Sequence, residues 1–350
     1  MGVPFLDNIE TSPQTVKVPR CLDKYSFYGT QILNSLYSDE HMKSLHIARA
    51  LTERTAQALV DFGAGTADRG LAMRDCGTYI VTDENSKIVG ANFCRQRLCP
   101  LCQKRKSLKT YSDFKRIMEA LSEYRFVHLV LTVPNCSADE LPFVLNHMQT
   151  ASTALFNHSY CKAAFKGVAR FTEVTYNPHR NDFHPHFHCL IAVNKSYATS
   201  RDYIKRERLR ALWTYYYNKA SSGDLFKRRT DDGVIAFVAA MLAHKKPEEQ
   251  YQIYISFADD GALPEIAKYC VKPLAFDIDL HKLAPVLEAL SVGLHNRRMI
   301  QLYGVIRETA HNLGIDLEDD DTEPLPEENK LTRYLWGYNR DIGCYAYYRR

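Results

Sequence analysis

The sequence predicts an α+β protein, in which a central antiparallel sheet with helices is preceded by a zinc-binding element of four cysteines. Two observations support the sheet. Strand-like and helical segments alternate between residues 126 and 273, and a turn at 177–182 joins two of the strands. The close spacing of four cysteines after residue 75 supports the metal element. The chain of 350 residues, 45% of them hydrophobic, is long enough for more than one domain.

The segments ahead of the sheet are inferred from periodicity and turn residues. Residues 1–40 are irregular, and an amphipathic helix is expected over 41–62, before a Gly-Ala-Gly stop. Two short strands at 78–81 and 87–89 are joined by a polar turn, which predicts a hairpin. A helix rich in Lys and Arg at its start is expected over 103–124.

The sheet and its helices follow in order. β-Branched residues indicate the first strand, and the Asn-Pro-His-Arg-Asn-Asp turn at 177–182 indicates a hairpin between the second and third. Two prolines bound the last helix, one at its first position and one after its end. The expected elements are a strand at 126–133, a helix at 141–156, strands at 170–176 and 186–193, helices at 201–220 and 234–244, a strand at 251–257 and a helix from Pro264 to before Pro273.

Hydropathy and charge exclude some classes of protein. The longest apolar run, Val234–Ala243, is far shorter than the roughly 20 residues of a membrane-spanning helix. The first residues lack a basic and then apolar export signal, and Leu6 stands where a myristoylation signal has Ser or Thr. We therefore expect a cytoplasmic protein without a membrane partner.

The net charge of +4 hides an uneven distribution. Residues 308–329 hold nine acidic side chains and no Lys or Arg, and the rest of the chain has 45 basic against 32 acidic residues, a net charge of +13. Such an excess suits a protein that holds phosphates. The acidic segment is expected to stay off such phosphates, either disordered or masking the basic surface.

Four of the ten cysteines are spaced as C-x17-C-x4-C-x2-C, at Cys76, Cys94, Cys99 and Cys102. Thiolates prefer tetrahedral zinc, and the last pair forms a tight knuckle that chelates one ion through two sulfurs. A closed four-sulfur site is structural rather than catalytic. Cys76 is the least certain of the four ligands, and the alternative is a chance cluster of buried cysteines.

A basic run accompanies this element, and we take six of its residues as DNA contacts. By itself such a run is more typical of a solvated helix face. The six residues are Arg95, Arg97, Lys104, Arg105, Lys106 and Lys109.

The strand at 186–193 carries His186 and His188 on one face, because side chains alternate along a strand. If the preceding turn closes symmetrically around residues 179–180, Glu173 lies opposite His186 and becomes a third metal ligand. His184 is the alternative, since it shares the same face. A lone histidine is more often a core or surface residue, but three at alternate positions favour a site for Mg²⁺ or Mn²⁺.

The last expected helix places Glu265, Tyr269 and Lys272 on one face by their spacing of four and three residues. A phenolate assisted by a nearby cation or metal can attack phosphorus, and a carboxylate one turn away can act as a general base. Taken alone, the pattern is more typical of a half-buried structural tyrosine, because 22 tyrosines make chance matches easy.

Together, the segment FVHLVLTVPN at 126–135, the histidine strand and the tyrosine helix resemble motifs I, II and III of HUH endonucleases. They look specifically like the rolling-circle replication initiators (Rep) of small plasmids. The resemblance covers about residues 75–310, and the segment at 296–304 is similar to the stretch that follows motif III. It implies a zinc element at 76–119 and an HUH endonuclease domain at 120–310. Periodicity and composition add a helical segment at 1–75 and an acidic linker with an aromatic and basic tail at 311–350.

The resemblance also implies the chemistry. His186 and His188 would bind the catalytic metal, and Tyr269 would nick one strand at the plasmid origin, leaving a 5′-phosphotyrosine and a free 3′-OH primer. Glu265 would activate water at termination, because Pro273 stands where two-tyrosine families have a second tyrosine. Lys272 would hold the scissile phosphate. Expected partners are double-stranded and single-stranded origin DNA and host helicase and polymerase, and the chain could act as a homodimer.

Two alternatives stay open at this stage. A single-tyrosine HUH transposase shares the motif order, whereas a conjugative relaxase has its tyrosine ahead of the histidines, which argues against it. A zinc-ribbon DNA-binding regulator without catalysis is the second alternative. The aromatic tail at 345–350 would either stack on bases or pack as a chain end, and we favour packing.

Overall fold

The computed structural model describes residues 40–82, 88–223, 234, 236–240, 251–258, 278–317, 334–340 and 344–348. The chain divides into two compact units. The first, here called the cysteine unit, comprises residues 1–106, 273–288 and 320–350, and the second, the sheet unit, comprises 107–272 and 289–319. This division does not test the four predicted domain boundaries, which stay a prediction. No helix in the described part of the chain is long and apolar enough to cross a membrane.

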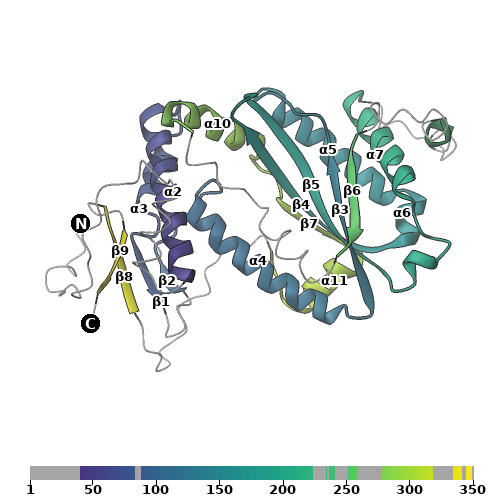
Figure 1. The fold of residues 1–350 in the computed structure, drawn as a ribbon, viewed down its shortest axis with the longest axis horizontal. Coiled ribbons are helices and arrows are strands. Elements are labelled where there is room, and N and C mark those ends of the chain that lie inside the picture. The colour runs from purple at the N-terminus through teal and green to yellow at the C-terminus, as the bar shows by residue number, and fades with distance from the viewer. Residues whose placement is uncertain are drawn as a thin grey trace. The chain divides into compact units, whose positions relative to one another are not determined.

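The cysteine unit joins the hairpin that follows α3 and a C-terminal hairpin in one sheet (Figure 1). Its strands lie antiparallel in the order β2-β1-β8-β9, so the C-terminal hairpin extends the expected hairpin of residues 78–89. Of the expected tail at 345–350, the described side chain of Tyr345 is buried in this hairpin. The elements are α2 (Glu40–Phe62), α3 (Ala67–Asp75), β1 (Tyr79–Thr82), β2 (Ile88–Ala91), β8 (Tyr334–Asn339) and β9 (Cys344–Tyr348).

The sheet unit is built on five antiparallel strands in the order β6-β3-β5-β4-β7. The strands are β3 (Tyr124–Thr132), β4 (Phe165–Asn177), β5 (Asp182–Asn194), β6 (Ile253–Phe257) and β7 (Ile300–Tyr303). Its helices are α5 (Leu141–Asn157), α6 (Ser159–Ala164), the short η1 (Tyr197–Thr199), α7 (Arg206–Ser221) and α11 (Gly304–Asn312). Two helices run across the division of the chain, α4 (Pro100–Ala120) and α10 (Leu280–Gly293). The α+β prediction with an antiparallel sheet is therefore confirmed.

The two faces of this sheet differ because side chains alternate along each strand. One face packs on α5 and α7. Leu129 and Phe187 of the sheet are buried there together with Trp213 of α7. The indole Nε1 of Trp213 donates a hydrogen bond to the Thr132 carbonyl at 2.8 Å, which ties α7 to β3. The opposite face carries Glu173 and the histidines, and we call it the metal face.

Some predicted boundaries are wrong. The basic helix spans Pro100–Ala120 instead of 103–124. It ends earlier than expected because the following strand already starts at Tyr124 instead of 126. The hairpin strands extend to Phe165–Asn177 and Asp182–Asn194, so they are longer than their β-branched cores indicate. The helix expected between Pro264 and Pro273 lies outside the described residues.

Candidate metal centres

The β4–β5 hairpin brings a carboxylate and two imidazoles together. Glu173 pairs with His186, as the symmetric turn predicts, and Phe171 pairs with His188. Paired residues lie on the same face of an antiparallel sheet, and residues two apart along a strand share that face. Glu173, His186 and His188 therefore all project from the metal face.

The geometry of these three side chains suits one metal ion. The Glu173 Oε2 atom lies 2.7 Å from His186 Nε2 and 2.9 Å from His188 Nε2. Adjacent ligands of an octahedral ion with bonds near 2.1 Å are about 3 Å apart, so the donor atoms need little movement to coordinate it. Glu173 is 0% exposed, and His186 and His188 are 9% and 7% exposed. A buried carboxylate is costly unless it is paired or coordinates a metal, so the donor set fits a cation.

Hydrogen bonds to the second ring nitrogens orient both imidazoles. His186 Nδ1 donates to the His184 carbonyl at 3.1 Å, which leaves Nε2 as the atom with a lone pair for a metal. His188 Nδ1 lies 3.1 Å from His128 Nε2, and their rings stack at 5.3 Å. For His188 Nε2 to coordinate, Nδ1 must carry the proton and donate it to His128. His128 is thus a supporting residue that sequence reasoning missed.

The His184 ring makes its hydrogen bond away from Glu173. Its Nδ1 lies 2.8 Å from the Asn135 amide oxygen, and the Asn135 amide nitrogen donates to Asp182 at 2.9 Å. Burial lowers the pKa of His184 below its usual value. The ligand atoms of Glu173, His186 and His188 lie within 4.8 Å of one another, while the His184 ring lies beside that of His186 at a centroid distance of 5.2 Å.

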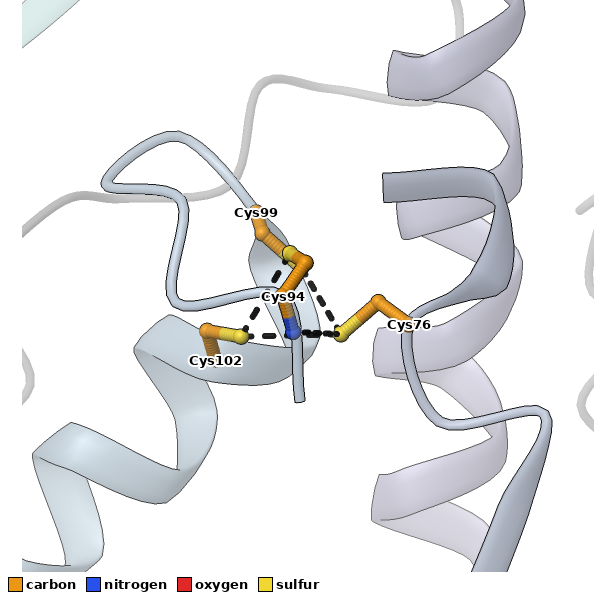
Figure 2. Close-up of side chains that lie close together, drawn as sticks. All are labelled: Cys76, Cys94, Cys99 and Cys102. Atoms are coloured by element: carbon orange, nitrogen blue, oxygen red, sulfur yellow. Dashed lines mark hydrogen bonds between the residues drawn. The ribbon is translucent and has the colours of Figure 1, made fainter. Parts of the chain in front are cut away.

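The four predicted cysteines also converge, in the cysteine unit (Figure 2). Their sulfur atoms lie 3.5 Å apart between Cys76 and Cys102, 3.6 Å between Cys76 and Cys99, and 3.7 Å between Cys94 and Cys102. Four sulfurs bound tetrahedrally at 2.3 Å from one zinc ion would be about 3.8 Å apart. The cluster, including the least certain ligand Cys76, therefore has the geometry of a closed zinc site.

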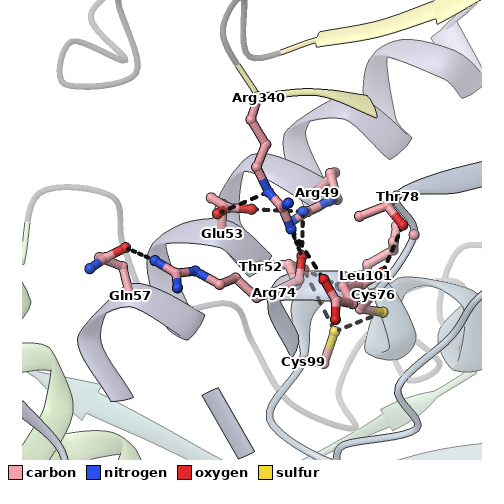
Figure 3. A network of polar contacts seen from close by, with 12 residues as sticks. Arg49, Thr52, Glu53, Gln57, Arg74, Cys76, Thr78, Cys99, Leu101 and Arg340 are labelled. Atoms are coloured by element: carbon pink, nitrogen blue, oxygen red, sulfur yellow. Dashed lines mark hydrogen bonds and ion pairs between the residues drawn. The ribbon is translucent and has the colours of Figure 1, made fainter. Parts of the chain in front are cut away.

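The knuckle of this cluster, residues 99–102, contacts Thr52 of α2. The backbone N–H of Leu101 donates to Thr52 Oγ1 at 3.0 Å, and the same oxygen lies 3.6 Å from Cys99 Sγ (Figure 3). A hydrogen bond from the thiol of Cys102 lowers the pKa of Cys99 well below that of an ordinary cysteine, which favours the thiolate that a metal needs. The spacing of the cysteines gives no sign of this contact, because Thr52 precedes Cys99 by 47 residues.

The basic residues expected to contact DNA lie between Cys94 and the third turn of α4. Arg95, with φ of 56°, and Arg97 are exposed in the loop between Cys94 and Cys99. Arg105 stacks over the Phe93 ring at 4.9 Å. Lys109 is paired with Asp113 at 3.3 Å and donates to the Asp316 carbonyl. Lys104 and Lys106 are half-buried in the first turns of α4.

Three predicted catalytic residues lie outside the described residues, namely Glu265, Tyr269 and Lys272. Their place relative to Glu173, His186 and His188 stays a prediction.

Comparison with known proteins gives a consistent set of relatives. A family model described as "Replication protein" matches residues 85–335. A "Protein rep" of Bacillus sp is 31% identical over 261 residues, which are 71% of this chain and 79% of the relative. A "Protein rep" of Staphylococcus aureus is 37% identical over 150 residues, 40% of this chain and 66% of that protein. One from Streptococcus pneumoniae is 26% identical over 254 residues, 71% of this chain and 72% of the relative. No solved structure matches.

Proposed function

Because this chain belongs to the replication protein family, we propose that it initiates rolling-circle replication of a plasmid by nicking one strand of the origin DNA. The convergence of Glu173 Oε2 with the Nε2 atoms of His186 and His188 is the observation that carries the nicking activity. The family alone supports replication initiation and origin binding. If the chain were a regulator without catalysis, a buried carboxylate facing two imidazoles would have no function.

In this proposal each predicted residue has a defined role. The Tyr269 oxygen bonds to phosphorus, the P–O3′ bond breaks, and the 5′ phosphate stays on the tyrosine while the 3′-OH becomes the primer. Glu265 accepts the phenol proton, and the departing 3′ oxygen takes a proton from solvent. At termination Glu265, after releasing its proton to solvent, deprotonates a water whose oxygen bonds to phosphorus, and the P–O bond to Tyr269 breaks as the phenolate takes up a proton. Lys272 holds the phosphate, and a Mg²⁺ or Mn²⁺ ion held by Glu173, His186 and His188 would act as a Lewis acid on a phosphate oxygen.

The cysteine unit supplies the second half of the proposal. Zn²⁺ bound by Cys76, Cys94, Cys99 and Cys102 would fix the loop that carries Arg95 and Arg97 and the start of α4, which would contact origin phosphates. The helicase and polymerase of the host would then act on the nicked origin.

One experiment tests the nicking activity. The wild-type chain is incubated with single-stranded origin DNA and Mn²⁺, and the products are separated under denaturing conditions. We expect a covalent protein–DNA adduct that EDTA prevents. An origin-binding chain that never forms this adduct would instead be the regulator.

The substitution Glu173→Gln tests the metal centre directly. The amide keeps the shape of the side chain but removes the charge, so we expect Mn²⁺ affinity, measured by titration calorimetry or electron paramagnetic resonance, to fall at least about 10-fold. Glu123→Gln, which changes an exposed carboxylate of the same unit, should leave Mn²⁺ affinity unchanged. Equal Mn²⁺ affinity of wild type and Glu173→Gln would remove Glu173 from the ligand set.

A further inference from the structure

An exposed aromatic side chain stands beside the metal centre on the same face of the sheet. Tyr254 lies on β6, the strand at one edge of the sheet. It pairs with Val130 of β3, which pairs with His188 of β5. Because opposite residues of antiparallel strands share a face, Tyr254 and His188 project from the same side. The Tyr254 side chain is 57% exposed, whereas Glu173, His186 and His188 are buried.

The Tyr254 ring is held in place by the supporting histidine. Its centroid lies 6.2 Å from that of His128 in an edge-on arrangement, with an interplanar angle of 71°. His128 in turn stacks on His188 at 5.3 Å with an angle of 16°. The rings of Tyr254, His128 and His188 therefore form one row from the edge of the sheet to the metal centre.

We propose that Tyr254 is a stacking subsite for a nucleobase of the DNA strand whose phosphate lies at the Glu173–His186–His188 centre, an inference that rests on the function proposed above. Two strand spacings separate Tyr254 from His188, about 10 Å, which neighbouring nucleotides of one strand can span. Every base has a π-face, so an oriented, exposed ring next to a phosphate site binds single-stranded DNA without needing a particular sequence. The subsite would hold the bases next to the scissile bond in position for attack.

Two substitutions at position 254 separate stacking from other roles of the residue. Tyr254→Phe keeps the aromatic face, and Tyr254→Thr removes it while keeping a residue that is favoured in strands. The probe is a single-stranded oligonucleotide that carries 2-aminopurine, whose fluorescence is quenched by stacking on a ring. We expect Tyr254→Thr to weaken binding by about 5- to 100-fold and to lose quenching, and Tyr254→Phe to keep both.

The control is Phe143→Leu, which removes an aromatic side chain that is 64% exposed on α5. It should change neither binding nor quenching. If the wild type binds the oligonucleotide and Tyr254→Thr binds and quenches equally well, the subsite is wrong while the proposed function stands. If the wild type does not bind single-stranded DNA, the proposed function itself fails.

A second inference comes from the cysteine unit, where the C-terminal hairpin contacts the loop that contains Cys76. The Tyr345 hydroxyl donates to the Gly77 carbonyl at 2.6 Å, directly after Cys76, and the Tyr338 N–H donates to the Thr78 carbonyl at 2.7 Å. Before Cys76, Arg340 donates to the Arg74 carbonyl at 2.8 Å and contacts the Asp75 carboxylate at 3.3 Å. Contacts from β8, β9 and their turn thus lie on both sides of this ligand.

The contacts of α2 strengthen this arrangement (Figure 3). Arg49 is fully buried, donates to the same Arg74 carbonyl at 2.8 Å, and lies under the Tyr338 ring at 4.4 Å. Gly77 has φ of 66°, and a Cβ there would come within 2.2 Å of the Leu101 side chain in the knuckle. The end of α3 and the loop at 76–78 are therefore packed between the hairpin, α2 and the knuckle.

The geometry points to Tyr345 and Arg340 as positioning residues for the zinc ligand Cys76. Groups that orient metal ligands from outside the coordination sphere commonly change metal affinity 10- to 100-fold. The inference needs no DNA or nicking activity, so it stands or falls independently of the first.

Zinc affinity of the full chain provides the test. We expect Tyr345→Phe combined with Arg340→Met to raise the zinc dissociation constant about 10-fold in competition with a chromophoric chelator. In the cobalt-substituted protein, the thiolate-to-metal absorption should weaken as Cys76 leaves the site. Tyr176→Phe, which removes a tyrosine hydroxyl bonded to Asn181 in the sheet unit, is the control. An unchanged dissociation constant and cobalt spectrum in the double variant would overturn the inference.

Discussion

Replacing Tyr269 with phenylalanine is expected to abolish the covalent adduct between this chain and single-stranded origin DNA. The substitution removes one oxygen, the atom that would bond to phosphorus, and phenylalanine offers no other nucleophile. Water cannot substitute without loss of the product, because its attack would leave a free 5′ phosphate and no protein–DNA bond. The amount of adduct formed in Mn²⁺, measured by denaturing gel electrophoresis, should therefore fall below detection. A lower rate of adduct formation alone is not expected.

Two further measurements make this result specific. Binding of Tyr269→Phe to duplex origin DNA should equal that of the wild type, because the proposed duplex contacts lie in the cysteine unit and α4. Tyr203→Phe, at an exposed tyrosine between η1 and α7, should form the adduct at the wild-type rate. If Tyr269→Phe still forms the adduct, another residue is the nucleophile and the assignment of the last helix fails.

The part of the metal centre that could be predicted is the part that forms locally. Glu173 and His186 are 13 residues apart, and one short turn fixes their register, so alternation alone places them on one face. Choosing between Glu173 and His184 needed the structure, because both satisfy alternation. The amide oxygen of Asn135, which follows β3 and lies outside the hairpin, is 2.8 Å from His184 Nδ1, and alternation along the hairpin gives no sign of this contact.

The supporting residues His128 and those of the C-terminal hairpin could not be predicted, because their contacts join segments that are far apart in the sequence. His128 reaches His188 through pairing of β3 with β5, two strands separated by a long connection whose register no turn specifies. The C-terminal hairpin pairs with β1 more than 250 residues earlier. Hydrophobic periodicity predicts that a segment is a strand, but a partner far along the chain is selected by packing of the whole unit.

Replacing Cys99 with serine is expected to unfold the cysteine unit while the sheet unit stays folded. Structural zinc contributes apparent binding free energies of about 10–16 kcal/mol at neutral pH, comparable with the whole stability of a typical domain, about 5–15 kcal/mol. Cys99 is fully buried, and its sulfur contacts those of other ligands and Thr52. Serine offers a harder, protonated oxygen in a site made for thiolates, so zinc affinity should collapse.

Hydrogen exchange followed by mass spectrometry distinguishes the two units. In Cys99→Ser the amides of α3, β1 and β2 should exchange rapidly, and those of β3, β4 and β5 should keep their protection, because the sheet unit has its own core of buried side chains from β3, β5, α5 and α7. Cys161→Ala, at a buried thiol in α6 outside the cluster, should leave α3, β1 and β2 protected. Full protection of the cysteine unit in Cys99→Ser would mean that its apolar packing, rather than zinc, holds β1, α2 and the C-terminal hairpin together.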